Sequence, residues 1–220
     1  MPFVPTGFPA LDNMIAGDSE CRGFPRGGMS LLVGATGSGK TTILKKVCER
    51  AHAKGLRVVW VEPGGSDSAK YRSVDGIHSI DDLAHLMAKL LHPNNQKCRA
   101  DLIVVDDVSL FTVEPTGPIA NMARSLSTMF HGDLGTTAVV LSVQSRRGSS
   151  STVREYNPPV SLEHRSWLTL GVVRNGECYD LKLVKSIVSL AGVSCTVNPG
   201  DLMDRSKIPT RYERILRGRD

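Results

Sequence analysis

The chain has 220 residues, of which 40% are hydrophobic, and a formal net charge of +5. This length suits one α/β domain and leaves little room for a second full domain. Five widely spaced cysteines, with no C-x-x-C pair, argue against a disulfide framework or a zinc site. No apolar run approaches membrane-spanning length, and the N-terminus lacks the features of a signal peptide. We therefore expect a soluble, cytoplasmic protein.

The chain opens with a segment rich in glycine and proline. Residues 6–12 read T-G-F-P-A-L-D, and residues 23–27 read G-F-P-R-G. Spacing alone predicts only a turn-rich approach to the first strand, which we expect at residues 29–33.

A phosphate-binding loop follows this strand. The sequence G-A-T-G-S-G-K-T at residues 34–41 matches G-x-x-x-x-G-K-[ST], and residues 42–54 continue with helical spacing. Backbone N–H groups of such a loop surround a phosphate, and the helix N-terminus adds its dipole. Lys40 would reach the β and γ phosphates of ATP, and the Thr41 hydroxyl would ligate Mg²⁺. The predicted nucleotide-binding residues are Gly34, Ala35, Thr36, Gly37, Ser38, Gly39, Lys40, Thr41 and Thr42.

Two further apolar runs predict buried strands that end in acidic residues. Residues 57–61 precede Glu62, and residues 102–105 precede Asp106 and Asp107. Ligands of open α/β sheets bind at the carboxyl ends of the strands. We expect Asp106 at this edge, where it would support Mg²⁺ together with Thr41, as a Walker B carboxylate does. Glu62 either activates the water that attacks the γ-phosphate or is a solvated side chain at a turn.

Two helices and a third buried strand are expected next. Ser79 and Asp82 form a capping-box pattern before a helix that reaches residue 91, and a second helix is expected at residues 118–131. The histidines nearby scatter around the first helix, which argues against a metal site. The strand at residues 137–144 ends in the polar Gln144.

Residues 145–163 are predicted to form a long polar loop. It contains Arg146, Arg147 and Arg154, which are suited to phosphates, and Tyr156, which is suited to stacking on a base. The alternative is a surface loop without a ligand.

The last third of the chain predicts strands at residues 166–173, 179–184 and 193–197. An Asn-Gly pair at residues 175–176 predicts the hairpin turn between the first two. Residues 205–220 carry six basic and two acidic residues, so this segment alone supplies +4. Such a tail binds a phosphate backbone, docks on an acidic neighbouring subunit or remains solvated. We expect a core at residues 1–204 and a basic tail at residues 205–220.

These motifs together resemble the RecA-like ATPases, the group of RecA, RadA, KaiC and DnaB. Members often open with T-G-x-x-x-L-D, then a G-[IF]-P-x-G turn and the phosphate loop, as this chain does at residues 6–41. The resemblance implies one α/β domain with a mainly parallel central sheet flanked by helices and a C-terminal antiparallel hairpin. It implies that the opening element packs beside the nucleotide site, that Glu62 is the catalytic carboxylate, and that Gln144 senses the γ-phosphate.

The resemblance also implies a substrate and an assembly. In this group the loop after the sensor strand contacts single-stranded DNA. Arg174 resembles the arginine finger of hexameric helicases, and Lys185 resembles the trans-acting lysine of recombinases, so a homo-oligomer is expected, as a filament or a ring. The leading hypothesis is an ATPase acting on single-stranded DNA in recombination, repair or replication. A KaiC-like regulatory ATPase with a protein partner is the alternative, and a small-molecule kinase is disfavoured by the opening element and by Gln144.

Overall fold

The computed structural model describes residues 3–62, 72–74, 77–91, 100–111, 137–145, 160–198 and 200. Its central feature is an eight-stranded sheet with the order β10-β9-β8-β3-β7-β6-β4-β5. The strands are β3 (Met29–Gly34), β4 (Val58–Val61), β5 (Arg72–Val74), β6 (Leu102–Val105), β7 (Ala138–Gln144), β8 (Leu168–Asn175), β9 (Cys178–Ser186) and β10 (Ser194–Val197). Strands β8 to β5 are parallel, whereas β9 and β10 pair antiparallel. This confirms the expected mainly parallel α/β fold with antiparallel C-terminal strands.

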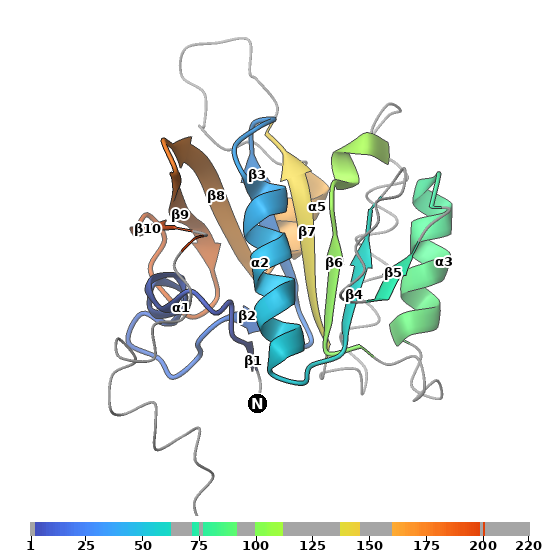
Figure 1. The fold of residues 1–220 in the computed structure, drawn as a ribbon, viewed down its shortest axis with the longest axis horizontal. Helices are drawn as coiled ribbons and strands as arrows, with labels where there is room; N and C mark the ends of the chain where they lie inside the picture. Colours follow the sequence, from blue (N-terminus) through green and yellow to red (C-terminus); the bar gives the residue numbers. More distant parts are fainter. Residues whose placement is uncertain are drawn as a thin grey trace, which may run out of the picture.

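Helices cover both faces of this sheet (Figure 1). The described helices are α1 (Pro9–Ala16), α2 (Lys40–Ala53), α3 (Ile80–Leu91), α5 (Val160–Arg165) and the 3₁₀ turn η2 (Val108–Phe111). One apolar cluster joins α1 and α2 to the sheet, and a second joins α3 and α5 to the opposite face. A two-stranded sheet of β1 (Phe3–Val4) and β2 (Phe24–Pro25) lies beside them. No helix in these ranges is long and apolar enough to cross a bilayer.

The central strands are continuous apolar runs because both of their faces are covered. Side chains alternate along a strand, so Val58 and Trp60 of β4 enter the cluster beneath α2, while Val59 and Val61 enter the other. The even-numbered residues at the ends of β4, β6 and β7 therefore belong to the α2 side. Side chains at these strand ends therefore point toward the same face of the sheet, the face that α2 covers.

Several expected elements differ from those observed. Residues 9–16 form α1 instead of a turn, and residues 160–163, expected to lie in the polar loop, belong to α5. The β8–β9 turn lies at residues 176–177, one residue later than expected, because Asn175 pairs with Cys178. The capping box is confirmed, since the Asp82 N–H donates to Ser79 Oγ at 3.1 Å. The expected helix at residues 118–131 and the tail at residues 205–220 lie outside the described residues.

The T-G-x-x-x-L-D element forms a compact structure at the N-terminus. The Thr6 N–H donates to Asp12 Oδ1 at 2.8 Å, and burial raises the pKa of the Asp12 carboxyl despite this bond. Arg50 of α2 donates to the Gly7 carbonyl at 2.8 Å and lies 4.0 Å from the Phe8 ring centroid. Arg50 is ten residues beyond Lys40, or about 15 Å along the helix. The element therefore packs against the far half of α2, and not beside the phosphate loop.

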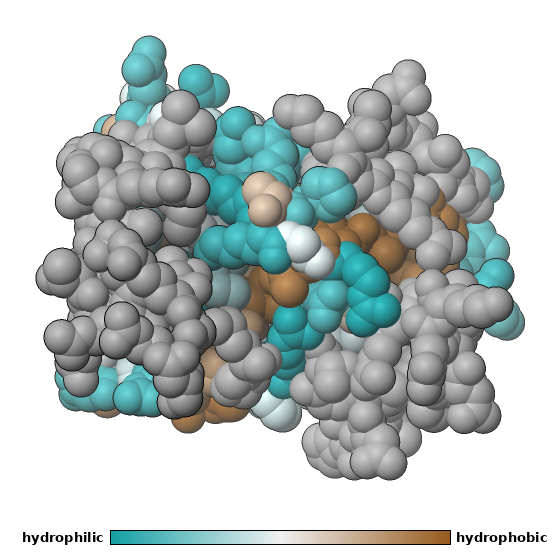
Figure 2. Space-filling model, turned by 60° about the horizontal axis from the view of Figure 1, so that its bottom comes forward, coloured by the Kyte–Doolittle hydropathy of each residue, from teal (hydrophilic) through white to brown (hydrophobic). Residues whose placement is uncertain are grey.

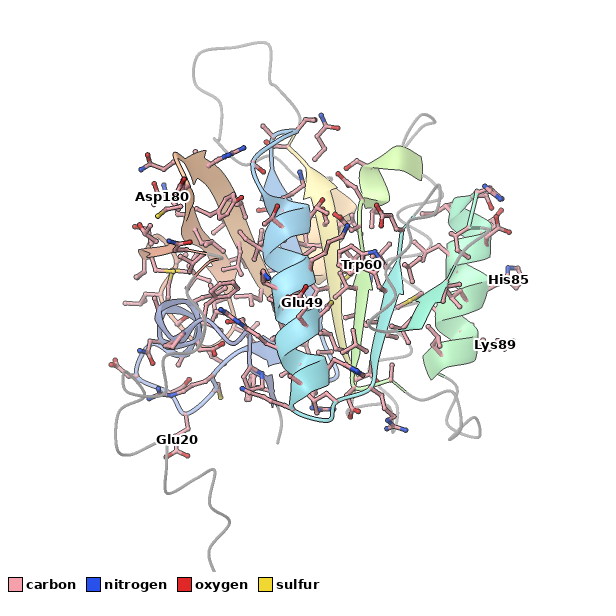
Figure 3. The ribbon with its side chains drawn as sticks, viewed as in Figure 1. Glu20, Glu49, Trp60, His85, Lys89 and Asp180 are labelled. Carbon is pink, nitrogen blue, oxygen red and sulfur yellow. The ribbon has the colours of Figure 1, made fainter. Side chains whose placement is uncertain are left out.

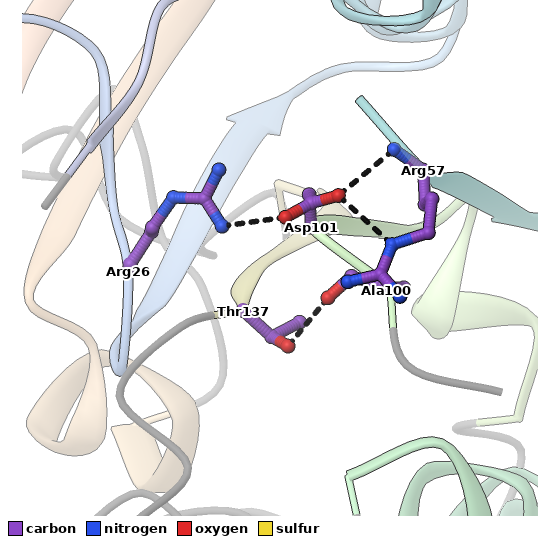
Figure 4. Close-up of polar contacts among 5 residues, drawn as sticks. All are labelled: Arg26, Arg57, Ala100, Asp101 and Thr137. Carbon is purple, nitrogen blue, oxygen red and sulfur yellow. Dashed lines mark hydrogen bonds and ion pairs between the residues drawn. The ribbon is translucent and has the colours of Figure 1, made fainter. Parts of the chain in front are cut away.

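A polar cluster joins the amino ends of the parallel strands (Figure 4). Asp101 accepts hydrogen bonds from Arg26 Nη1 at 3.0 Å, from the Arg57 N–H at 3.0 Å and from Arg57 Nε at 3.2 Å. Thr137 Oγ1 donates to the Ala100 carbonyl at 2.6 Å. Burial alone would raise the pKa of Asp101, but the bonds from Arg57 and Arg26 outweigh it and hold the pKa below its ordinary value. Figure 2 turns this end of the molecule forward, where hydrophilic and hydrophobic residues lie side by side on the described surface.

The mutation Asp101→Asn is expected to lower the free energy of unfolding by about 2 kcal/mol at pH 7, the scale of hydrogen bonds to a charged group. Because the folded pKa is depressed, the carboxylate stabilises the fold above its unfolded pKa of about 4, and this contribution is lost as the pH falls through the folded value. Urea denaturation at pH 7 and at about pH 2, below the depressed folded pKa, measures the difference. The exposed Asp18→Asn is the control. An equal loss at both pH values, or none, would contradict this account.

Candidate active site

The phosphate loop joins β3 to α2 at the carboxyl edge of the sheet. Gly37 and Gly39 adopt positive φ angles of 78° and 96°, which only glycine adopts without strain. Lys40 is the first residue of α2 and is 7% exposed. Its Nζ donates to the carbonyls of Gly34 at 3.1 Å and Ala35 at 3.2 Å. The ammonium is therefore held across the loop, within reach of a phosphate bound there.

The remaining loop residues divide between an open and a packed side. Ala35, Thr36, Gly37, Thr41 and Thr42 are exposed, whereas Ser38 is buried. A Cβ at Gly37 would meet nothing, whereas a Cβ at Gly39 would overlap the Tyr179 ring of β9. Tyr179 thus supports the loop from an element far away in sequence, and no sequence signal pointed to it.

Asp106 follows β6 at the same edge of the sheet, on the side that α2 covers. Asp106 is 5% exposed, and its buried Oδ1 has no hydrogen-bond partner among the residues that the structure describes. The Asp106 N–H donates to the Val61 carbonyl at 2.9 Å, which ties the end of β6 to the end of β4. A buried carboxylate oxygen without a partner suits a cation, and Mg²⁺ is usually held by one or two protein groups together with phosphate oxygens. Asp106 and the exposed Thr41 hydroxyl therefore fit such an ion.

Asp107 has a different role in the fold. Its Oδ1 accepts the Ser109 N–H at 2.8 Å and caps the first turn of η2. Burial raises the pKa of the Asp107 carboxyl, although the Ser109 bonds and the charge of Lys40 oppose this.

Glu62 follows β4 directly and is half-buried. Its Oε2 accepts a hydrogen bond from Trp60 Nε1 at 3.1 Å. Because Trp60 belongs to the cluster beneath α2, the Glu62 carboxylate lies on the side of the sheet that carries the phosphate loop. Val61 and Val105 are paired residues of β4 and β6, so Glu62 and Asp106 leave neighbouring strands at the same level.

Gln144 connects β7 to the phosphate loop. It pairs in register with Gly34, and its Nε2 donates to Thr36 Oγ1 at 2.8 Å. The Gln144 N–H donates to Ser109 Oγ at 2.6 Å, which links the strand end to η2. Strand β7 lies between β3 and β6, so Gln144 stands between the loop and the Asp106 strand. Ser109 was not identified from sequence, because a serine in a short loop carries no pattern.

The other predicted residues lie elsewhere or are not described. Arg174 is exposed near the end of the β8–β9 hairpin, where it pairs in register with Tyr179 and donates to the Gly176 carbonyl at 3.0 Å. Lys185 donates to the carbonyls of Glu163 at 2.6 Å and His164 at 3.3 Å, at the end of α5, and burial lowers its pKa. The predicted DNA-contacting residues Arg146, Arg147, Arg154 and Tyr156 lie outside the described residues.

This fold and this loop define a P-loop nucleoside triphosphatase. A family model described as Novel STAND NTPase 5 matches residues 10–147, more than half of the chain. The chain belongs to this family. The matched region contains the phosphate loop, Glu62, Asp106 and Gln144.

Comparison with solved structures shows the same fold. A crystal structure of the RadB recombinase superposes with a TM-score of 0.67 at 16% sequence identity, covering 88% of this chain and 94% of that chain. At this identity the similarity establishes a RecA-like fold. A search of curated protein sequences found no match.

Proposed function

We propose that this chain is a Mg²⁺-dependent ATPase that acts on single-stranded DNA in recombination, repair or replication. The observation that carries this proposal is the position of Gln144. Its side chain contacts Thr36 of the phosphate loop at 2.8 Å, and Ser145 alone separates it from Arg146 and Arg147. The Ser145 N–H also donates to the Gly34 carbonyl at 3.0 Å. A rearrangement of the loop around a nucleotide would therefore be transmitted to the basic segment.

In this proposal each group at the carboxyl edge has a chemical task. Lys40 and the loop N–H groups bind the phosphates of ATP, and Asp106 with Thr41 holds Mg²⁺. When bound, Mg²⁺ neutralises charge on the β and γ phosphates. Glu62 orients the attacking water and accepts its proton. Lys40 and Thr41 begin α2 after β3, Glu62 follows β4 and Asp106 follows β6, so all four lie at the carboxyl edge of the sheet.

The DNA-binding part of the proposal comes from sequence and from the fold comparison. Arg146, Arg147 and Arg154 would neutralise phosphates, and Tyr156 would stack on a base. The similarity of fold to a recombinase supports this assignment.

The proposal includes a homo-oligomer, as a filament or a ring. The exposed Arg174 would stabilise charge on a phosphoryl group in a neighbouring subunit. Lys185 would do the same only after leaving the α5 carbonyls that it now binds. The basic tail at residues 205–220 would contact DNA or the neighbouring subunit.

Replacing Arg146 and Arg147 together by alanine is expected to weaken binding to a single-stranded oligonucleotide about 10-fold at low salt. It should also reduce the slope of log affinity against log salt by up to about 1.4, because two phosphate contacts are lost. Fluorescence anisotropy over a range of salt concentrations measures both quantities. Affinity for ATP should not change.

The matched control removes two exposed lysines away from the carboxyl edge: Lys54, the C-cap of α2, and Lys89, near the end of α3. This control should retain the salt dependence of the wild type. Equal behaviour of the two double variants would exclude the segment at residue 146 from DNA binding. No oligonucleotide binding by the wild type at any salt concentration would instead favour a regulatory ATPase with a protein partner.

A further inference from the structure

We infer that Trp60 is a positioning residue for the hydrolysis reaction, acting through Glu62. The inference rests on the proposed function, because it concerns the carboxylate assigned there to water activation. Trp60 Nε1 donates to Glu62 Oε2 at 3.1 Å. Since an N–H group is directional, this bond fixes one carboxylate oxygen and leaves Glu62 Oε1 to accept a proton.

The indole itself is held firmly by its surroundings. Trp60 is fully buried and lies on β4 beside α2, in the apolar cluster that this helix shares (Figure 3). On the α2 side, Lys45 Nζ lies 5.7 Å from the centroid of its ring. A large ring packed between a strand and a helix has few alternative rotamers, so its N–H points in one direction.

This rigidity matters because Glu62 lies just beyond the end of β4. A half-buried glutamate at a strand end has three side-chain torsions, and an anchored oxygen removes most of that freedom. A general base that is held within hydrogen-bond reach of the proton that it removes is a principal source of catalytic efficiency. The orientation of Glu62 is thus tied to the core through Trp60.

The structural alternative is that Glu62 merely satisfies a buried indole N–H, as such groups usually require. The two roles predict different kinetics. If Trp60 acts through Glu62, then Trp60→Phe should lower kcat about 10-fold and leave KM within about 2-fold, because only the reacting geometry changes. In a Glu62→Gln background, Trp60→Phe should have no further effect on kcat.

The measurement is a double-mutant cycle on kcat, with Trp167→Phe as the matched control. Trp167 is the only other tryptophan, and its ring packs against Gly28 before β3, away from the carboxyl edge. Melting temperatures are recorded for every variant, and assays are run well below them. A purely structural role would give a fall in stability with kcat unchanged, or equal effects of Trp60→Phe in both backgrounds, and either result would overturn the inference.

The contact has its own test, which does not require turnover. The nitrogen-15 spectrum should contain two indole N–H resonances, one from each tryptophan. Glu62→Ala should shift the Trp60 resonance and speed its exchange with solvent, while the Trp167 resonance stays in place. An unmoved Trp60 resonance would overturn the inference even in an active enzyme. If the Trp60 resonance moves in Glu62→Ala but the wild-type protein hydrolyses no ATP, the contact is established and the proposed function is refuted.

Discussion

The variant Lys40→Ala is expected to lose ATP hydrolysis, with a fall in kcat/KM of at least about 100-fold. The ammonium is the one basic side chain that the structure places within the phosphate loop, where it bonds the Gly34 and Ala35 carbonyls. Without it, charge that develops on the transferred phosphoryl group loses its nearest positive partner. Steady-state phosphate release measures the loss, and binding of a fluorescent ATP analogue should weaken in parallel.

The matched control for this variant is Lys46→Ala, six residues further along the same helix. Lys46 is partly exposed and pairs with Glu49 at 2.9 Å, so its removal takes the same single positive charge from α2 outside the phosphate loop. Hydrolysis by Lys46→Ala should remain within about 2-fold of wild type, because a surface ion pair contributes little. Retained turnover in Lys40→Ala would refute the assignment of this loop as the nucleotide site.

The second large effect is expected from Glu62→Gln. Loss of a general base typically lowers kcat about 10²-fold to 10⁴-fold, whereas the amide retains the size of the side chain and an acceptor for the Trp60 N–H. Binding of ATP should remain within about 3-fold of wild type, because Glu62 acts on the water and not on the phosphates. Single-turnover hydrolysis together with nucleotide affinity separates the two steps.

Asp107→Asn provides the comparison for Glu62, since Asp107 is also a carboxylate at this edge and follows Asp106 directly. Asparagine retains an oxygen for the Ser109 N–H and therefore preserves the cap of η2. A small effect of Asp107→Asn beside a large effect of Glu62→Gln would support the assignment. The reverse order would transfer the role of general base to Asp107.

Much of the fold could be predicted because its strands are buried on both faces and its turns have strong local signals. The run before the phosphate loop, the capping box at Ser79 and the Asn-Gly hairpin all appear near their expected places. Parallel strands end at one edge, so Glu62, Asp106 and Gln144 were expected to meet the loop there, and the structure brings them to it. Their chemical roles remain predictions.

What could not be predicted depends on short elements and long-range contacts. Helix α5 has six residues, too few for a helical period to be visible, and α1 has eight, with glycine on both sides. Pro9 at the first helical position was an available but weak signal for α1. The contact of Tyr179 with Gly39 depends on how β9 lies against the loop, which no local pattern contains. Trp60, by contrast, stands two residues before Glu62, and strand alternation would have placed both on one face.

The most direct test of the account is steady-state ATP hydrolysis by the wild-type protein with Mg²⁺, with and without single-stranded DNA, at low and moderate salt. We predict hydrolysis that requires Mg²⁺, rises when DNA is added and loses this increase at moderate salt. Hydrolysis at one rate regardless of DNA would retain the active site and contradict the DNA-directed function. No hydrolysis with or without DNA would contradict the account at its centre, the assignment of Lys40, Asp106 and Glu62 to one working site.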